Sequence, residues 1–516
     1  MRREGTSDAR LFCQPVNEAN LQQHFKPGRR TRGLLPKLAQ TATMSTALLL
    51  AAASPPTALP VLNSSVQRND PEASASKAAL RSGGTLITPF QADSFANSFG
   101  INTRFGPADI YTSQRPVVER YLIDLGFRHI RDGGVADNSD TRTFLRDLCT
   151  NYGIHSSMGL DDTNTDAQIL QYVKDVPCID MVEGPNELNG RPDWEQRIAT
   201  FVPHAYRLIR STPAFTGIPF VGPSITRLED SDALSAVVDL SQSVDMGNKH
   251  SYPGQRNIGG ADGSGAKGFG SVHDACPKYA YGSFFYQICI AQATTKDKPV
   301  WTTETGYSST PIGAPDPPPH PPYGSIPYGV AAKYLPRLLA YEFANGIART
   351  YIFSLVDGSS GCAGPFNSFG IIEQDCPNTG LASSLHVKPA FYALKNLMAT
   401  VADPGPSFTP APLSLKISGG DAKLQTLLLQ KRNHEYLLVY WVEGSDWNVP
   451  AGTYETVEPE HFMLTIAGIG NGEGAREFGI DATGSLTKAE AVHFVDNATD
   501  VAASDEIHFL TFSVVK

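Results

Sequence analysis

The chain has 516 residues, of which 41% are hydrophobic and 18% are charged, so it can bury a large core and is too long for one small module. The formal net charge of -10 gives no basic surface of the kind that nucleic-acid binding requires, and we expect no nucleic-acid partner. No apolar run is long enough to cross a bilayer, and we expect no membrane span.

The first 53 residues have the pattern of an export signal. Basic residues between positions 29 and 37 precede the apolar stretch MSTALLLAAA, which ends in small residues suited to cleavage. We predict a leader over 1–53, cleavage near Ala53, and a secreted or periplasmic mature protein; a disordered tail is the alternative. Residues 54–84 are rich in Ser, Ala, Pro and Asn, which favours a linker.

The cysteines provide an independent indication of export. Six of the seven lie after the leader, an even number, as expected of a chain oxidised outside the cytoplasm. No CxxC motif or Cys/His cluster indicates a metal site, so we expect neither metal nor cofactor. Sequence leaves the connectivity open, and the local pairs that we favour are Cys149 with Cys178, Cys276 with Cys289, and Cys362 with Cys376.

Residues 85–400 show eight short apolar stretches that alternate with longer amphipathic ones. Eight alternations over about 270 residues match an α/β fold, the (β/α)8 TIM barrel. A doubly wound open sheet would also alternate, but no GxGxxG turn follows the first expected strand. The expected strands lie within residues 97–103, 127–132, 153–160, 179–187, 218–224, 244–252, 299–306 and 349–357.

Amphipathic segments predict helices between these strands. A proline inside a helix removes a hydrogen bond, so Pro336 is expected to kink the last helix or to begin its main segment. The clearest helical segments are residues 115–126, 140–153, 193–211 and 331–346.

From about residue 401 the apolar period changes to two, which predicts a small β-sandwich over residues 401–516. A strand from residues 85–95 is a candidate addition to it. The expected strands of the sandwich are 423–430 and 435–444, which are joined by the turn KRNH, followed by 461–468, 475–480 and 506–515.

Two carboxylates stand at the ends of expected barrel strands. Glu187 ends the fourth strand and Glu304 ends the seventh. The active site of such a barrel lies at the C-terminal ends of its strands, where the fourth and seventh strands face each other across the mouth. Two opposed carboxylates are what cleavage of a glycosidic bond requires.

The motifs GPNE (184–187), HSY (250–252) and TETGY (303–307) together resemble those of the retaining glycoside hydrolases of clan A. KPAFYALKNL (388–397) resembles the helix that closes such barrels before a β-sandwich, as in the xylosidase, arabinofuranosidase and cellulase-like members. The resemblance covers roughly residues 95–400. It departs from the clan on the eighth strand, where many members carry a tryptophan and this chain has Phe353.

Carried over by motif, the resemblance implies that Glu187 is the general acid/base and Glu304 the nucleophile. We also expect the negative charge of Glu304 to raise the pKa of Glu187. Asn186 would bind the sugar 2-hydroxyl. His250 and Tyr252 would line the pocket, and Tyr252 is a candidate hydrogen-bond donor to Glu304. Arg131 would lie near the nucleophile. The substrate-binding candidates are Asn186, His250, Tyr252, Arg131, Tyr307 and Asp357.

Structural alternatives remain for these residues. Glu187 would otherwise cap the next helix, Glu304 would be a structural carboxylate, and His250 would be a core histidine. Arg131 would otherwise pair with its neighbour Asp132. Trp301 is expected in the core rather than under a sugar, and Asp161, Asp162 and Asp357 are equally suited to capping loops.

The sequence therefore predicts a secreted retaining glycoside hydrolase that acts on an oligo- or polysaccharide. The sugar, the linkage and the oligomeric state are not predicted. A transglycosylase on the same site and a non-catalytic glycan-binding barrel are the alternatives. A metal-dependent hydrolase would need clustered His and Asp ligands, which the motifs do not supply.

Overall fold

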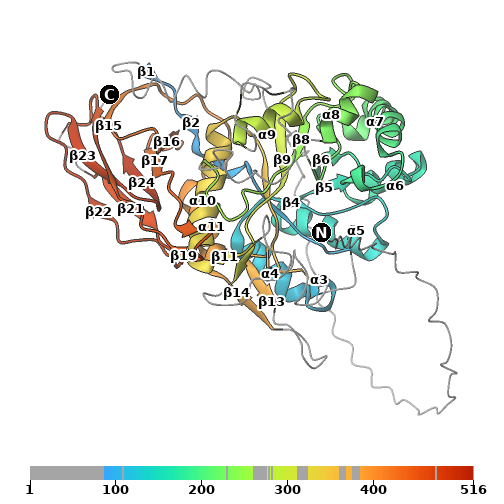
Figure 1. Ribbon diagram of the computed structural model, residues 1–516, viewed down its shortest axis with the longest axis horizontal. Helices are drawn as coiled ribbons and strands as arrows, with labels where there is room; N and C mark the ends of the chain where they lie inside the picture. The colour runs from blue at the N-terminus through green and yellow to red at the C-terminus, as the bar shows by residue number, and fades with distance from the viewer. Residues whose placement is uncertain are drawn as a thin grey trace, which may run out of the picture. The chain divides into compact units, whose positions relative to one another are not determined.

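The structure is a computed structural model that describes most of the chain from residue 86 onward (Figure 1). The predicted leader, the predicted linker and the predicted disulfide partners Cys362 and Cys376 lie outside the described residues. The described ranges are 86–106, 110–227, 230–259, 283–310, 324–358, 368–374, 384–470 and 474–514, with Cys276 and Tyr279.

The first large unit is an eight-stranded parallel barrel, which confirms the predicted fold class and all eight predicted strands. A parallel bridge between Val221 and Met246 connects the two outer strands of the sheet and so brings the barrel close to closure. In sheet order the strands are β7 (Phe220–Val221), β6 (Ile179–Glu183), β5 (His155–Gly159), β4 (His129–Arg131), β3 (Phe99–Asn102), β12 (Thr350–Ile352), β9 (Val300–Thr305) and β8 (Gly247–His250).

The helices around the barrel begin and end where local chemistry favours it. Asn138 caps the N-terminus of α5 by accepting from the Thr141 N–H, and Gly153 ends α5 with a φ of 67°. The four predicted helices are confirmed as α4, α5, α7 and α10. The principal helices are α4 (Arg115–Leu125), α5 (Ser139–Tyr152), α6 (Asp166–Asp175), α7 (Trp194–Ser211), α8 (Asp230–Val237), α9 (Phe284–Ala291), α10 (Tyr328–Ala344) and α11 (Pro389–Val401). Shorter helices are α2 (Ala92–Ala96) and α3 (Ile110–Ser113).

Pro336 lies within α10 and does not begin it. The helix starts at Tyr328, directly after Pro327, and continues through Pro336 to Ala344. Thirteen of its 17 residues are buried, so tertiary packing offsets the hydrogen bond that the proline removes.

Apolar side chains fill the inside of the barrel and form a cluster separate from the core under the helices. Trp301 belongs to this cluster, and the Arg349 guanidinium lies 5.3 Å from its ring centroid. Trp301 is therefore a core residue, as predicted. The remaining members of the cluster are Met181, Val221, Met246 and Tyr351.

The C-terminal part consists of two main sheets, mostly antiparallel, with a second hydrophobic core between them. The predicted strands are confirmed as β16 (Leu424–Gln430), β17 (Tyr436–Val442), β20 (Glu460–Ile466), β21 (Arg476–Ile480) and β24 (Ile507–Phe512). Strands β15 (Leu413–Gly419) and β23 (Ala498–Ala503) were not predicted. Strands β1 (Leu86–Ile87) and β2 (Phe90–Gln91), which precede the barrel, pair with β15 and β16.

Helix α10 connects the barrel to the sandwich through buried charged contacts. The Arg337 guanidinium donates to the Val442 carbonyl at 3.1 Å and pairs with Asp446 at 3.1 Å. Lys333 pairs with Asp446 at 3.2 Å and with Asp505 at 2.5 Å. Because the Arg337–Asp446 pair is buried, removing either partner would leave a charge without compensation.

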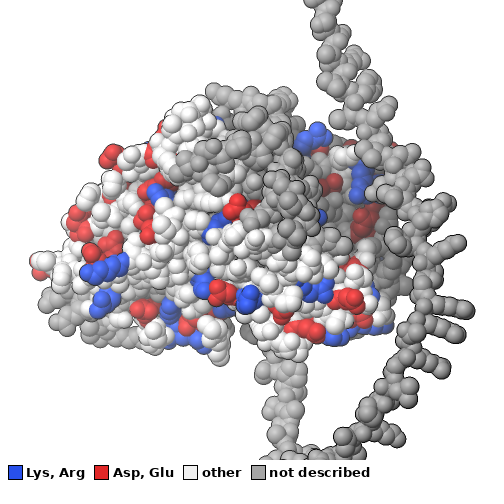
Figure 2. All heavy atoms as spheres, turned by 90° about the horizontal axis from the view of Figure 1, so that it is seen from below, with Lys and Arg blue, Asp and Glu red and all other residues white. Residues whose placement is uncertain are grey.

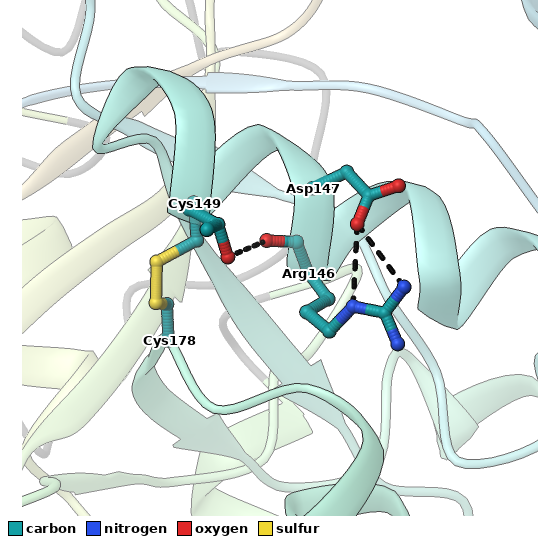
Figure 3. The surroundings of a disulfide bond; sticks show 5 residues. Arg146, Asp147, Cys149 and Cys178 are labelled. Carbon is teal, nitrogen blue, oxygen red and sulfur yellow. Dashed lines mark hydrogen bonds and ion pairs between the residues drawn. A yellow bond between two sulfur atoms is a disulfide. The ribbon is translucent and has the colours of Figure 1, made fainter. Parts of the chain in front are cut away.

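Two of the three predicted disulfides lie among the described residues, and both are present. Cys149 in α5 is bonded to Cys178, which precedes β6, and Figure 3 shows this bond beside the Arg146–Asp147 ion pair. Cys276 is bonded to Cys289 in α9.

Acidic and basic side chains are interspersed on the face shown in Figure 2, so the excess of acidic residues is not gathered into one patch on the described part of that face. Within the described ranges, no helix has the length and apolar character to cross a bilayer.

Candidate active site

The C-terminal ends of four barrel strands bring the predicted catalytic residues together. Arg131 and His250 are the last residues of β4 and β8, and Glu304 is the penultimate residue of β9. Glu187 follows β6 by four residues. His250 and Glu304 are register partners in neighbouring parallel strands, which fixes their side chains at the same level of the barrel.

The two predicted catalytic carboxylates both approach the same ring nitrogen of His250. Its Nδ1 atom is 2.7 Å from Oε1 of Glu187 and 3.6 Å from Oε2 of Glu304. One oxygen of each carboxylate and one imidazole nitrogen all lie within 4.8 Å of one another. The Glu187 side chain is 30% exposed whereas that of Glu304 is 12% exposed, so Glu187 has the greater access to solvent.

An unusual backbone conformation aims Glu187 at this cluster. Its φ of 48° lies in the left-handed region, which residues other than glycine seldom adopt. The Glu187 N–H donates to the Ser224 carbonyl at 3.1 Å, and the side chain makes no capping bond to the short helix η2 (Leu188–Gly190) that follows. The helix-capping alternative is therefore wrong. Gly184 permits this turn, because a Cβ there would lie 2.8 Å from the Pro223 nitrogen.

Both oxygens of Glu304 are held by hydrogen bonds. Arg131 Nη1 donates to Oε1 at 2.6 Å, and the Tyr252 hydroxyl donates to Oε2 at 2.8 Å. Burial, together with the charge of Glu304, raises the pKa of Tyr252 well above 10, so the phenol keeps its proton and remains a donor. The carboxylate is thereby held in one orientation, facing the barrel mouth.

Arg131 connects most of the site. Its Nε atom donates to Glu183 at 2.6 Å, and its Nη2 atom donates to Asn186 at 2.7 Å. Burial opposes the charge on Arg131, but Glu183 and Glu304 outweigh it and raise the pKa of the guanidinium. Asp132 instead accepts from the Thr103 hydroxyl and from the Phe105 N–H, so the alternative in which Arg131 pairs with Asp132 is wrong.

A buried polar network beneath the cluster was missed by the sequence interpretation. Glu183 Oε1 accepts from Asn248 Nδ2 and from the Thr303 hydroxyl, both at 2.9 Å. The Thr303 hydroxyl also lies 2.9 Å from His250 Nε2. Glu183 carried the same signal as Glu187, a carboxylate at the end of an apolar run, whereas Asn248 and Thr303 carried none.

The pKa of Glu187 contradicts the expectation drawn from the sequence. Burial acts to raise it, but the hydrogen bond and charge of His250, with smaller effects of Thr226 and Arg131, bring it below the ordinary value of 4.5. We expected the charge of Glu304 to raise this pKa. Arg131 pairs directly with Glu304 and neutralises its charge, so the influence of His250 on Glu187 prevails.

An aromatic surface stands beside the nucleophile candidate. The Tyr252 ring packs edge-on against Phe369 at 5.3 Å between centroids and against Phe353 at 6.3 Å. Phe353 directly follows β12, the eighth expected strand, on which the sequence has no tryptophan. Phe369 is buried, so the partly buried Phe353 ring supplies the apolar face beside the Tyr252–Glu304 pair.

Tyr307 and Asp357 do not join the cluster. Tyr307 is buried, and its ring packs 5.3 Å from that of Tyr334 in α10. Asp357 accepts from Lys388 Nζ at 2.9 Å and from the Gly370 N–H at 2.8 Å, which is a structural role. Burial, opposed by Lys388, raises the pKa of Asp357 to about 6.

Asp161 and Asp162 also have structural partners. Asp161 accepts from the Thr163 N–H and hydroxyl, and Asp162 forms an ion pair with Arg197. Both therefore cap or fasten the loop after β5.

We predict that Tyr307→Phe leaves kcat/KM within about twofold of wild type, since removing a hydroxyl without a partner breaks no hydrogen bond. That hydroxyl has no hydrogen-bond partner among the described residues. Tyr252→Phe is the matched control, because it removes a hydroxyl that contacts Glu304 and should lower kcat/KM at least about tenfold. Steady-state kinetics of the two variants test the placement, and a large loss in Tyr307→Phe would contradict it.

Glu187, His250 and Glu304 are also the group of described residues whose ligand atoms lie close enough to hold a metal ion. Both oxygens of Glu304 already accept hydrogen bonds, one of them from a guanidinium. A cation bound there would have to displace Tyr252 or share the carboxylate with a positive charge, which opposes metal binding.

No protein-family model matches the sequence, and no curated protein matches it. Among solved structures, a glucosidase from Croceicoccus marinus is similar in fold, with a TM-score of 0.51 and 10% sequence identity over 84% of this chain and 98% of that chain. An endo-β-1,6-glucanase has a TM-score of 0.44 and 10% identity over 84% of this chain and 95% of that chain. Identities this low establish a likeness of fold alone.

Proposed function

We propose that the protein is a retaining glycoside hydrolase that acts on an oligo- or polysaccharide. The observation that carries the proposal is the pair Glu187 and Glu304, in which one oxygen of each carboxylate lies within 4.8 Å of the other at the C-terminal end of the barrel. Retaining glycosidases hold their two carboxyl groups about 5 Å apart, whereas inverting ones leave about 6.5–9.5 Å for a water molecule. The fold shared with a glucosidase agrees with this proposal.

In the first step, Glu304 attacks the anomeric carbon while Glu187 gives its proton to the departing glycosidic oxygen. This produces a glycosyl ester on Glu304 and releases the leaving group as an alcohol. In the second step, Glu187 takes a proton from water as that water attacks the anomeric carbon and frees Glu304. Glu187 is thus reprotonated, and both carboxyl groups return to their initial states.

The surrounding residues favour this division of roles. Arg131 and Tyr252 hold Glu304 in one orientation for attack, and Arg131 also orients Asn186. Glu187, the more exposed carboxylate, has the access to solvent and leaving group that an acid/base needs. Phe353, which is only partly buried, offers an apolar face on which a sugar ring can pack.

The lowered pKa of Glu187 predicts an acidic pH optimum. The acid must be protonated in the free enzyme, so kcat/KM falls as the pH rises above the pKa of Glu187. In His250→Phe the stabilising hydrogen bond is lost and burial remains, which raises this pKa. The alkaline limb of the kcat/KM profile should therefore move to higher pH.

A pH profile of kcat/KM for wild type and His250→Phe measures this effect. Tyr252→Phe is the control, because it perturbs Glu304 and should lower kcat/KM without an upward shift of the alkaline limb. An unmoved limb in His250→Phe would mean that His250 does not set the pKa of Glu187.

A screen of aryl glycosides and plant and microbial polysaccharides tests the proposed function, with Glu187→Ala and Glu304→Ala in parallel. Release of sugar that both substitutions abolish supports it and identifies the substrate. Binding without release would favour a glycan-binding barrel, and transfer to an added sugar acceptor in preference to water would favour a transglycosylase. Loss of activity in a chelator, restored by a divalent cation, would favour a metal-dependent hydrolase.

Export is part of the proposal. The two disulfides agree with a chain that folds outside a reducing cytoplasm. The leader over 1–53 and the division into a barrel over 85–400 and a sandwich over 401–516 remain predictions, which N-terminal sequencing of the secreted protein and limited proteolysis would test.

A further inference from the structure

The loop that carries Tyr252 is attached to the sandwich. The described part of this loop that follows β8 is residues 251–259. Asn257 Nδ2 and the Gly259 N–H both donate to Oε2 of Glu443, a sandwich residue that directly follows β17, the latter at 3.2 Å. The Ser445 hydroxyl donates to Oδ1 of Asn257 at 2.9 Å. A single sandwich segment thus binds two residues of the active-site loop.

The Glu443 carboxylate is buried between the two parts of the protein. It is 7% exposed, and its other oxygen accepts from the Trp441 indole N–H at 2.7 Å. A buried carboxylate needs such donors on both oxygens, because it has lost its water. Gly259 permits the approach, since a Cβ there would lie 2.7 Å from Cδ of Glu443. The contact is therefore a closely fitted one, with a donor from each part.

The near end of the same loop is attached to the nucleophile candidate. The Ser251 N–H donates to the backbone carbonyl of Glu304 at 3.1 Å, and the Tyr252 hydroxyl donates to its side chain. Between the two ends, Gly254 turns the chain with a φ of 72°, and Gln255 donates to the Ser325 carbonyl at 2.9 Å. Only four residues separate Tyr252 from Asn257, so displacement at one end is transmitted over a short distance.

We infer that Glu443 is a positioning residue for the active site: it anchors the loop 251–259 so that the Tyr252 hydroxyl stays on Glu304. This inference rests on the proposed function for its effect on catalysis. The sandwich then contributes to the reaction through the orientation of the nucleophile, without touching substrate.

Glu443→Gln tests the anchor with little change of shape. A glutamine has one acceptor oxygen, so its NH₂ group must face either the Asn257 and Gly259 donors or the Trp441 donor. We expect kcat to fall about tenfold with KM nearly unchanged, since displacement of a positioned group costs mainly transition-state stabilisation. Gly259→Ala is the second variant and acts from the barrel side, where its Cβ forces Glu443 away.

A double-mutant cycle distinguishes positioning from general destabilisation. If Glu443 acts through Tyr252, Glu443→Gln should change kcat less than about twofold in a Tyr252→Phe background. Leu464→Ala is the matched control, because Leu464 is buried in the separate sandwich core and should destabilise the sandwich while leaving kcat unchanged at a temperature where every variant is folded. The inference would be overturned if Glu443→Gln lowered kcat by the same factor in the wild-type and Tyr252→Phe backgrounds, or if Leu464→Ala lowered kcat as much as Glu443→Gln does.

Amide hydrogen exchange tests the anchor without reference to activity. In Glu443→Gln, the Gly259 and Ser251 amides should both exchange at least about tenfold faster, because opening at one end of the loop releases the other. Faster exchange at Gly259 with an unchanged Ser251 amide would overturn the inference. If the wild-type protein cleaves no glycoside, the proposed function fails, and this measurement still decides whether Glu443 holds the loop.

Discussion

Glu304→Gln is expected to abolish turnover, with kcat lowered by at least about 10³-fold, as loss of a covalent nucleophile does in other enzymes. The amide is nearly the same size and can still bond to Arg131 and Tyr252, so the fold should be kept. What the variant lacks is a carboxylate oxygen able to form the glycosyl ester. Steady-state kinetics on the substrate identified by the screen measure the loss, and normal activity would contradict the proposed mechanism.

Covalent trapping of the glycosyl-enzyme intermediate tests directly whether Glu304 is the nucleophile. A 2-deoxy-2-fluoro glycoside with a good leaving group slows the second step, so the intact mass of wild type should rise by one glycosyl unit, with the label on the peptide that contains Glu304. Glu183→Gln is the matched control. It removes another carboxylate bonded to Arg131, but one whose side chain is only 3% exposed, and it should still allow labelling of Glu304. A label on any other residue would reassign the nucleophile.

The barrel was predictable because its local signals agree with its global arrangement. Strands such as β6, β7 and β12 are short apolar runs bounded by glycine, proline or polar residues, as parallel strands that are buried on both faces favour, whereas β5 (HSSMG) and β8 (GNKH) are mostly polar. The position of Glu187 and Glu304 at strand ends then placed them at one face of the barrel. Their convergence on His250 follows from the strand order, which the eight alternations also implied.

The errors concern features that depend on backbone direction or on distant charges. Tyr307 belongs to the motif TETGY, yet Gly306 adopts a φ of 154° and a Cβ there would lie 2.5 Å from the Phe353 carbonyl, so the chain turns and Tyr307 enters the core. The pKa of Glu187 depends on His250 and Arg131, which are far away in the sequence. Neither a glycine torsion nor the electrostatic balance among three strands has a signature in a local pattern.

The sandwich shows a related limit. Strand β15 alternates buried and exposed residues through LSLKISG, but it follows a proline-rich stretch that hid its start. Strand β23, ATDVAA, has few large apolar residues, because it pairs with β20 on one side and packs with small side chains. The role inferred for Glu443 was equally hidden, since it depends on which loop the sandwich contacts.

Glu187→Ala is expected to separate the two steps of the reaction. For natural glycosides, whose departing oxygen needs a proton, kcat/KM should fall about 10²- to 10⁴-fold. For aryl glycosides with an acidic phenol, the first step needs no proton and should remain fast. The second step lacks its general base, so phenol should appear in a burst followed by slow turnover.

Azide discriminates between the two carboxylates because it is an anionic nucleophile that needs no general base. With Glu187→Ala it should restore turnover of aryl glycosides and give a glycosyl azide that keeps the anomeric configuration of the substrate, since it attacks the ester on Glu304. With Glu304→Ala it would instead occupy the place of the missing carboxylate and give the opposite configuration. Proton NMR of the products identifies each anomer. If azide fails to rescue Glu187→Ala, or if both variants give the same anomer, Glu187 and Glu304 do not have the roles proposed here.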